Sequence, residues 1–374
     1  MTDYYWYIIA FVISLVLTLV TTPVIRHLAI RNKTLDYPEV EPTRKIHDRP
    51  MPLMGGLALY ISVVLAMLII ALFSGQLIGD GMPWKYIIGI SLGGLILMFG
   101  GWLDDRYNLS AKQQIIWPIL AVITVIASGI GIDFITNPFN GVLYLNQIDF
   151  DIIKIGETVF QLTLWADVFA FIWLMGIMYT TKFLDGLDGL TSGITAVGSI
   201  VIFIISLRPE VLQPGTALLA AILAGAAIGF LFFNWHPAKI FLGEGGSLFL
   251  GFMLGVLSII AGSKIATALL VMGIPVLDVV WVIIRRVLIE KRSPFKADKK
   301  HLHFRLLDVG LSHRKSVVFL IFLSAVFSLI GLFVGGENKI WTFGLLILVM
   351  IILGLSLVFV YRIKHPKTID KIEQ

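Results

Sequence analysis

The feature that most constrains this chain is a series of apolar runs, each long enough to cross a lipid bilayer as a helix. We place these runs at 4–28, 53–73, 84–103, 114–132, 162–183, 189–207, 214–234, 245–262, 265–289, 316–335 and 340–361. Of the 374 residues, 57% are hydrophobic and 14% charged. A soluble domain is about half apolar and about a quarter charged. The sequence therefore predicts a single all-α polytopic membrane domain over residues 1–374, with about eleven transmembrane helices.

The basic residues lie mostly on one side of these spans. The loops of the other side hold five of the 29 Lys and Arg residues, namely Lys85, Lys154, Arg208, Lys264 and Lys339. By the positive-inside rule, the side that holds the remaining 24 is cytoplasmic. This orientation places the N-terminus outside and the C-terminus in the cytoplasm. The net charge of +5 then reflects topology and gives no indication of nucleic-acid binding.

The longest outer loop covers about residues 133–161 and contains "GVLYLNQIDFDIIKIG". Asn140-Gly141 is a turn signal, and apolar and polar residues alternate on either side of it. We expect a small extracytoplasmic β-hairpin there and give it no catalytic role.

The polar clusters all fall on the predicted cytoplasmic side, at helix ends and in loops. "GWLDDRYNLSAK" and "KFLDGLDGL" supply the aspartates, "FNWHPAKIFLGEGGS" supplies amide, aromatic and acidic groups, and "KADKKHLHFRL" and "RKIHDRPMPLMGG" supply basic ones. The residues of interest are Asp104, Asp105, Asp185, Asp188, Asn234, Phe241, Glu244, His301, His303, Arg305, Arg44, Lys45 and His47. Ionisable groups at membrane depth are costly, so we expect these residues to meet at one membrane surface.

Carboxylates gathered at one surface favour a hard divalent cation. Mg²⁺ takes oxygen ligands, keeps several waters and bridges to substrate phosphates. Nearby Arg, Lys and His can neutralise a diphosphate, and the glycines beside Asp185, Asp188 and Glu244 let the backbone approach a ligand closely. On one helical turn, Asp185 and Asp188 would share a face. The pattern indicates a magnesium-dependent phosphoryl-transfer site, in which Mn²⁺ could substitute.

Each cluster also has a structural interpretation. Asp104-Asp105 could form a solvated helix boundary, Glu244 could open a helix, and the basic residues after 285 could be topology determinants or contact lipid headgroups. The chain has no cysteine and no second His pair at ligand spacing, which argues against zinc. The joint occurrence of the clusters on one face favours the functional interpretation.

These motifs resemble those of the polyprenyl-phosphate N-acetylhexosamine-1-phosphate transferases. "RKIHDRPMPLMGG", "GWLDD", "FLDGLDGL", "FNWHPAKIFLGEGGSLFLGF" and "HLHFRLLDVG" occur in the order of that family and cover nearly the whole chain. The resemblance implies that a polyprenyl phosphate, such as undecaprenyl phosphate, attacks the β-phosphorus of a UDP-HexNAc and releases UMP. This would be the first membrane step of cell-envelope polysaccharide synthesis, at the plasma membrane, and a homodimer would be compatible with it.

The resemblance also implies roles for individual residues. Asp104 and Asp105 match paired aspartates that handle the lipid phosphate, one of them as a candidate base. Asp185 matches a catalytic, magnesium-associated aspartate, and Glu244 stands where the family has a metal-binding aspartate. The matches to substrate contacts are Asp188, Asn234 and Phe241 for the nucleotide, and Lys112, His301, His303 and Arg305 for the phosphates or the sugar, with His47 and Lys182 completing the set.

Three positions depart from the pattern of the family. Lys182 stands where Asn is usual, Glu244 replaces an aspartate, and Phe304 replaces the third histidine of a His-x-His-His run. Lys182 could neutralise an aspartate or a phosphate, and Glu244 can still bind magnesium with one more methylene of reach. These departures bear on donor identity and metal geometry more than on reaction class.

Other functions fit the sequence less well. An ion-coupled transporter would need acids near mid-span, where only Asp167 and Asp278 lie, and we expect Asp278 to pair with the adjacent arginines. A CDP-alcohol phosphotransferase would show an Ala-Arg step after its first Asp-Gly, which is absent after Asp185. The phospho-N-acetylmuramoyl-pentapeptide transferases of the same superfamily and a catalytically silent relative remain as alternatives. The Arg-Lys-Ile-His and His-Pro-Ala-Lys stretches resemble the UDP-N-acetylglucosamine branch.

Overall fold

The computed structural model describes residues 4–40, 47–79, 82–136, 141–155, 158–262, 265–291, 301–334 and 339–364. Arg44, Lys45, Asn140 and Lys264 lie outside these ranges.

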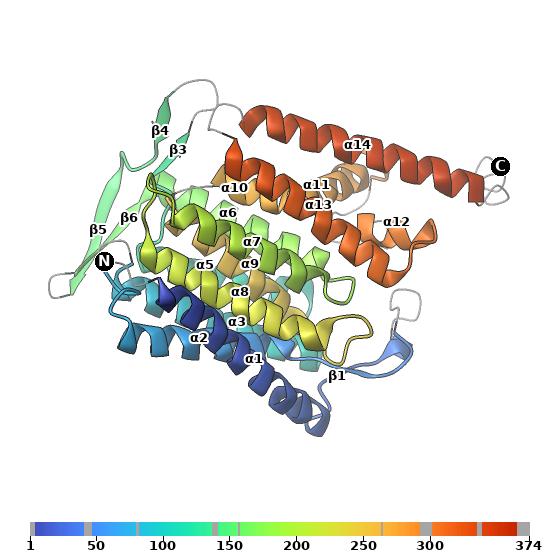
Figure 1. Ribbon diagram of the computed structural model, residues 1–374, viewed down its shortest axis with the longest axis horizontal. Helices are drawn as coiled ribbons and strands as arrows, with labels where there is room; N and C mark the ends of the chain where they lie inside the picture. Colours follow the sequence, from blue (N-terminus) through green and yellow to red (C-terminus); the bar gives the residue numbers. More distant parts are fainter. Residues whose placement is uncertain are drawn as a thin grey trace.

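Eight helices in the described ranges are long and apolar enough to cross a membrane. They are α1 (Tyr5–Arg31), α2 (Gly55–Phe73), α3 (Trp84–Tyr107), α6 (Leu164–Leu184), α8 (Pro214–Asn234), α9 (Gly243–Ile260), α13 (His313–Phe333) and α14 (Lys339–Lys364). They lie side by side as one bundle (Figure 1). The prediction of a polytopic α-helical membrane protein is confirmed.

Shorter helices account for the other three predicted spans. The span at 114–132 is α5 (Ile116–Ala127), preceded by the single turn α4 (Ala111–Gln114), and the span at 189–207 is α7 (Leu190–Ser206). The span at 265–289 is interrupted: α10 (Ile265–Val271) is followed by α11 (Gly273–Ile284) and a π-helical turn, Arg285–Ile289. Pro275 has no N–H to continue the α10 ladder, which explains a break at this point.

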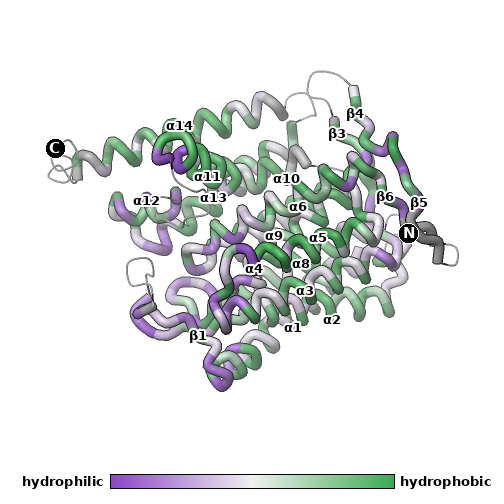
Figure 2. Tube along the Cα trace, turned by 180° about the vertical axis from the view of Figure 1, so that it is seen from behind, coloured by the Kyte–Doolittle hydropathy of each residue, from purple (hydrophilic) through white to green (hydrophobic). Residues whose placement is uncertain are grey.

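The centre of the bundle is formed by α8 and α9. Within their most apolar windows, 78% of α8 and 89% of α9 is buried, against 28% of α1 and 11% of α14. Helix α1 packs on α8, α7 packs on α8, and both α3 and α6 pack on α9. The outer helices keep apolar side chains on their exposed faces, as a lipid environment requires. Hydrophobic residues predominate along the helices (Figure 2).

The strands form three small antiparallel pairs. At one end of the bundle, β3 (Phe134–Thr136) pairs with β4 (Val142–Tyr144), and β5 (Asp149–Ile155) pairs with β6 (Thr158–Thr163). The predicted hairpin is confirmed as β3–β4, and β5–β6 adds a second one. At the opposite end, β1 (Leu35–Asp36) pairs with β2 (Met51–Pro52), which returns the chain from α1 to the start of α2.

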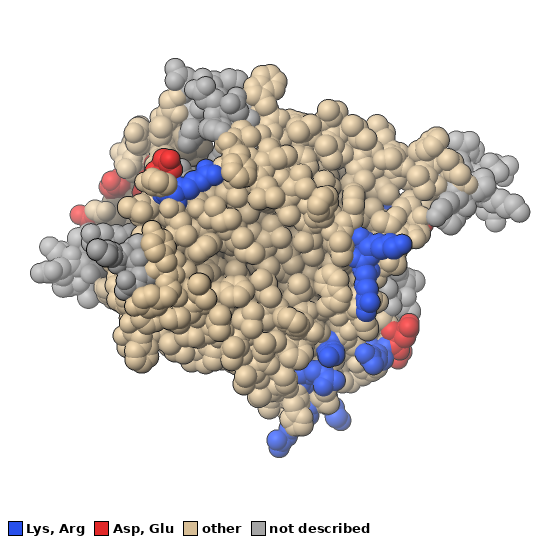
Figure 3. All heavy atoms as spheres, viewed as in Figure 1, with Lys and Arg blue, Asp and Glu red and all other residues tan. Residues whose placement is uncertain are grey.

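Positive charge is concentrated at one end of the bundle. On the face drawn in Figure 3, most Lys and Arg side chains gather at the end where α1 ends and α13 begins, and the acidic side chains of the hairpin end lie far from them. The short helix α12 (Leu302–Asp308) lies at the basic end, as do the hydrophilic segments around β1 and α4 (Figures 1 and 2). The predicted site residues lie at this end.

Candidate active site

Asp105 joins the end of α3 to the start of α9. Its Oδ1 accepts a hydrogen bond of 3.1 Å from the backbone N–H of Glu244, in the first turn of α9. A side chain on Gly243, whose φ is +73°, would place its Cβ 2.3 Å from Asp105 Oδ2. The carboxylate therefore satisfies an N–H that the first turn of a helix otherwise leaves open, and it sits at the positive end of the helix dipole.

Glycines bring three helices into backbone contact around this joint. A Cβ on Gly101 of α3 would lie 2.2 Å from the backbone N of Gly245, and a Cβ on Gly56 of α2 would lie 2.2 Å from Cα of Gly246. The first turn of α2 is also bonded to the residue before α9: the N–H of Gly56 donates to Leu242 O at 2.8 Å. The position of Glu244 is thus set by backbone packing.

Phe241 lies on the same ladder of backbone hydrogen bonds. Its N–H donates to Pro52 O, and its C=O accepts from the N–H of Gly55, both at 2.9 Å. The ring of His47 meets the Phe241 ring edge-on at 5.3 Å, and His47 Nε2 lies 3.0 Å from Asp36 Oδ2. The side chain of Phe241 is half-buried at this end of the bundle.

Asp185 and Asp188 lie in the turn between α6 and α7 and not on a shared helical turn. Burial, together with the nearby carboxylates of Asp188 and Glu244, raises the pKa of Asp185 from 3.8 to about 7. Asp188 is held from the other side: its Oδ2 accepts from the N–H of Ala238 at 3.1 Å and lies 2.8 Å from His236 Nδ1. Asp185 is therefore a buried acid with a raised pKa, whereas Asp188 is already held by its contacts with His236 and Ala238.

Lys182, the departure from the family pattern, forms an ion pair with Glu244. Its ammonium also donates to Gln114 Oε1 at 3.0 Å and lies 5.5 Å from the centre of the Tyr179 ring. Gln114 in turn donates through Nε2 to Asp104 Oδ1 at 2.9 Å. Asp104, Gln114, Lys182 and Glu244 thus form one continuous polar chain across α3, α4, α6 and α9.

Asn234 connects two loops of the site. Its Oδ1 accepts from the N–H of Gly189 at 3.0 Å, and its Nδ2 donates to Ile240 O at 3.1 Å. Because its amide already bonds both loops, the buried Asn234 holds the Asp-Gly turn and the segment before α9 together.

The two histidines of the last large loop stack beside the Asp-Gly turn. The rings of His301 and His303 lie 5.7 Å apart with 9° between their planes, and Phe304 packs against His303 at 4.3 Å. A Cβ on Gly186 would lie 2.3 Å from His303 Nε2. Burial lowers the pKa of His303 to about 4, so this ring is neutral near pH 7.

The remaining predicted residues lie on two short helices, α12 and α4. Arg305 is half-buried on α12, and Lys112 is exposed on α4. The sequence did not indicate Gln114 or the pair formed by His236 and His313, whose rings stack at 4.0 Å next to Asp188. The spacing of polar and apolar residues could not have indicated the contacts of Gln114 or the His236–His313 pair, because these contacts join segments that are distant in sequence.

Carboxylate oxygens in this centre match the ligands that Mg²⁺ prefers, and the raised pKa of Asp185 marks a buried acid that a cation would stabilise in its charged form. Among the described residues, however, Asp105, Asp185 and Glu244 do not form a set with ligand atoms within 4.8 Å of one another. A single ion could therefore not touch all three in this arrangement. Glu244 acts electrostatically on Asp185, and Mg²⁺ commonly uses one or two protein carboxylates.

Asp188, His236 and His313 do bring their ligand atoms within 4.8 Å of one another. The two imidazole rings are stacked with only 17° between their planes. Nitrogen lone pairs lie in the ring plane, so nearly parallel rings cannot direct them at one ion. We interpret this cluster as a support for Asp188.

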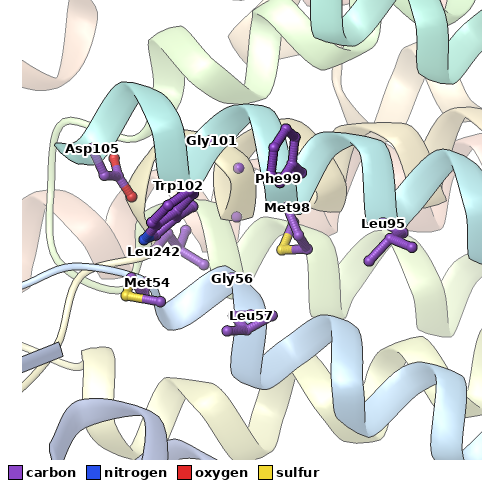
Figure 4. A pocket seen from close by; sticks show the side chains of 12 residues that line it. Met54, Gly56, Leu57, Leu95, Met98, Phe99, Gly101, Trp102, Asp105 and Leu242 are labelled. Atoms are coloured by element: carbon purple, nitrogen blue, oxygen red, sulfur yellow. The ribbon is translucent and has the colours of Figure 1, made fainter. Parts of the chain in front are cut away.

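A cavity of about 210 Å³ opens beside Asp105, between α2 and α3 and over the start of α9. Figure 4 shows Leu95, Phe99, Trp102 and Asp105 in a row along α3, with Met54 and Leu57 of the α2 segment opposite. Apart from Asp105 the lining is apolar, and it includes the glycines of the helix contacts.

Comparison with known proteins gave consistent matches. The sequence pattern of the family described as glycosyl transferase family 4 matches residues 87–262. The chain is 33% identical over 355 residues to the probable undecaprenyl-phosphate N-acetylglucosaminyl 1-phosphate transferase of Bacillus subtilis (strain 168), covering 92% of this chain and 89% of the relative. It is 35% identical over 332 residues to the decaprenyl-phosphate N-acetylglucosaminephosphotransferase of Mycolicibacterium smegmatis, covering 81% and 76%. A phospho-N-acetylmuramoyl-pentapeptide-transferase of Desulforamulus reducens is 32% identical over 352 residues, covering 89% and 96%.

Proposed function

Since the chain belongs to glycosyl transferase family 4, we propose that it transfers an N-acetylhexosamine 1-phosphate from a UDP-sugar to a polyprenyl phosphate in the membrane. An oxygen of the lipid phosphate forms a bond to the β-phosphorus of the UDP-sugar. The bond from that phosphorus to the oxygen bridging the α-phosphate breaks, and UMP leaves with the bridging oxygen. The product is a HexNAc-diphospho-lipid.

The convergence of the clusters carries this proposal. Asp105, Asp185 and Glu244 come from three different helix ends, yet Asp105 bonds the backbone of Glu244, and Glu244 raises the pKa of Asp185. His303 meets the same turn from a fourth segment. Phosphoryl transfer depends mostly on positioning and charge neutralisation, which such a convergence supplies.

In this proposal Asp185 and Glu244 would hold Mg²⁺. When bound, the ion supplies positive charge to the diphosphate. Lys182, paired with Glu244, adds a second positive charge beside it. Asp105 has one oxygen committed to the start of α9, so its proposed contribution is to place Glu244 as well as to face the acceptor phosphate.

The donor would lie across the Asp-Gly turn. Phe241 offers a ring face for uracil, and Asp188, fixed by His236 and Ala238, offers a carboxylate oxygen to the nucleotide. His301, His303 and Arg305 would contact the phosphates or the sugar from α12, and Lys112 and His47 would lie at the mouth of the site.

The apolar cavity beside Asp105 supports lateral access for a lipid acceptor, because it leads along α3 to a polar end (Figure 4). The names of the relatives support N-acetylglucosamine 1-phosphate as the transferred group, and the muramoyl-pentapeptide donor is the alternative. The concentration of Lys and Arg at the end that carries the site supports a cytoplasmic active site at the cell membrane (Figure 3).

The test is release of UMP by the purified protein with undecaprenyl phosphate, Mg²⁺ and single UDP-sugars. We expect UMP with UDP-N-acetylglucosamine and none with UDP-N-acetylmuramoyl-pentapeptide. Asp105→Asn and Asp185→Asn should each lower turnover by more than about 100-fold, since each removes a charge from the reacting centre while keeping side-chain volume. A folded wild-type protein that releases no UMP with any UDP-HexNAc would refute the proposal.

A further inference from the structure

Asp278 of α11 has both carboxylate oxygens directed at the start of α12. Its Oδ2 lies 2.8 Å from His301 Nδ1, and its Oδ1 accepts a 2.8 Å hydrogen bond from the backbone N–H of Leu302. This single side chain therefore holds both a histidine ring and the first turn of the helix that carries His303 and Arg305. The expected pairing of Asp278 with the adjacent arginines is not what these contacts show, and Arg285 lies 3.3 Å from a different acid, Glu290.

The contact determines where the proton of His301 resides. An ionised carboxylate can only accept hydrogen bonds, so Nδ1 must carry the hydrogen that it donates to Asp278. In a neutral imidazole the other nitrogen, Nε2, then has a free lone pair, and in an imidazolium it becomes a second donor. His301 is 6% exposed, so solvent does little to compete with this arrangement.

A series of stacked rings connects His301 to the Asp-Gly turn. Phe183, at the end of α6, stacks on His301 at 5.9 Å with 20° between the planes, and His301 stacks on His303 at 9°. His303 is 2% exposed, its Nε2 has no hydrogen-bond partner among the described residues, and it faces Gly186 between the two aspartates. A rotation of His301 would therefore displace the ring that contacts the Asp-Gly turn.

Asp278 lies in the second part of the interrupted ninth span. The helix is interrupted between α10 and α11. Helix α11 begins at Gly273, where a Cβ would lie 2.2 Å from a side-chain carbon of Leu346 in α14. Asp278 is therefore on a short helix fixed by its own packing, and not in the middle of one long span. It lies two residues beyond Val276, whose N–H still bonds Met272 O at 2.8 Å.

We propose that Asp278 is a positioning residue for the transfer reaction: it fixes the tautomer and the ring orientation of His301, and through the stack it places His303 against the Asp-Gly turn. The proposal rests on the proposed function. Asp278 itself touches neither substrate, so it acts through His301.

The first test is the Asp278→Asn variant. The amide oxygen can still accept from Leu302, but the amide nitrogen presents a donor to His301 Nδ1 and reverses the tautomer. We expect kcat for UMP release to fall about 10- to 100-fold with KM for the UDP-sugar changed less than about threefold, the size of effect typical for residues that orient a functional histidine. Asp278→Glu, which keeps the acceptor, should recover part of the lost kcat.

A double-mutant cycle separates positioning from general structural support. In a His301→Phe background, which retains a stacking ring, Asp278→Asn should cause no further loss of kcat, because the two residues act through one contact. Asp308→Asn is the matched control, since Asp308 is exposed on α12, and it should leave kcat unchanged. Multiplicative losses in the double mutant would overturn the proposal.

Nitrogen-15 NMR of the histidine rings tests the tautomer without activity. In the wild type, the signal lost in His301→Phe should be that of a ring protonated at Nδ1, and in Asp278→Asn it should move to the Nε2-protonated form. A wild-type His301 protonated at Nε2 alone would overturn the inference whatever the assay shows. Failure of UMP release with the expected NMR signature would count against the proposed reaction and not against this contact.

Discussion

The ammonium of Lys182 pairs with the carboxylate of Glu244, at the position where the proposed function needs Glu244 to bind a divalent cation. The two residues are also two of the three departures from the family pattern, and the structure joins them in one contact. A positive side chain and a divalent ion then compete for the same oxygen.

Lys182→Asn should therefore raise the affinity of the site for Mg²⁺. Without the ammonium, Glu244 keeps an uncompensated charge that Mg²⁺ can neutralise, and the concentration of Mg²⁺ giving half-maximal UMP release should fall about tenfold, equivalent to ~1.4 kcal/mol. Lys33→Asn, at an exposed residue after α1 whose φ of 54° suits asparagine, is the control and should leave the metal dependence unchanged. An identical Mg²⁺ titration for Lys182→Asn and the wild type would show that the pair does not compete with the metal.

Stability of the metal-free protein should depend on the ionisation of Asp185. Because burial raises the pKa of Asp185 from 3.8 to about 7, its contribution to stability is full below pH 3.8 and is lost as pH rises to about 7. Thermal unfolding in EDTA should show the Tm of the wild type falling over this window relative to Asp185→Asn, which cannot titrate. Added Mg²⁺ should reduce the fall. Parallel Tm profiles of the two proteins would contradict the assignment.

Gly186→Ala should disturb the contact with His303. The added methyl group would meet Nε2 of a buried ring at 2.3 Å, so the ring must move away from the Asp-Gly turn. We expect at least a tenfold loss of kcat, as for other displaced orienting groups. Gly176→Ala, in α6, is a matched control because a Cβ there has no atom within 4 Å, and it should be neutral or stabilising by up to about 1 kcal/mol. Equal activity of both variants would argue against a role for the His303 contact.

The absence of cysteine allows a direct test of orientation. Single cysteines at exposed Lys315, at the basic end, and at Tyr144, in the β3–β4 hairpin, provide reporters on opposite ends of the bundle. In intact cells, a membrane-impermeant maleimide should label Tyr144→Cys and should label Lys315→Cys only after permeabilisation. The reverse pattern would place the site outside the cell.

Hydropathy and motif spacing predicted the helical bundle and the gathering of the polar residues at one of its ends, but not the contacts between these residues. A run such as 214–234 must be a helix because its backbone groups can find partners nowhere else in lipid. The clustering of Asp105, Asp185 and Glu244 at one end followed from the alternation of helix direction. Spacing could not show that Asp188 and Asp185 lie in a turn, nor that Asp278 faces His301, since both depend on how a short segment bends.

The break in the ninth span was also beyond the sequence pattern. Residues 265–289 are mostly apolar, so their composition predicts a continuous helix, whereas packing of Gly273 against Leu346 and the proline at 275 determine where it stops. The three carboxylates likewise lie near one another without surrounding one point, because Asp105 is oriented by the backbone of α9.

The glycine contacts of α2, α3 and α9 have a mechanical consequence for a protein in a fluid bilayer. Where the helices touch through backbone atoms, no side chain that could change its rotamer lies between them. Their separation near Asp105 and Glu244 is therefore fixed by atomic radii. Changes in lateral pressure or bilayer thickness would be absorbed by the loosely packed periphery, above all by α14. The reaction centre would then keep its dimensions as the surrounding lipid varies.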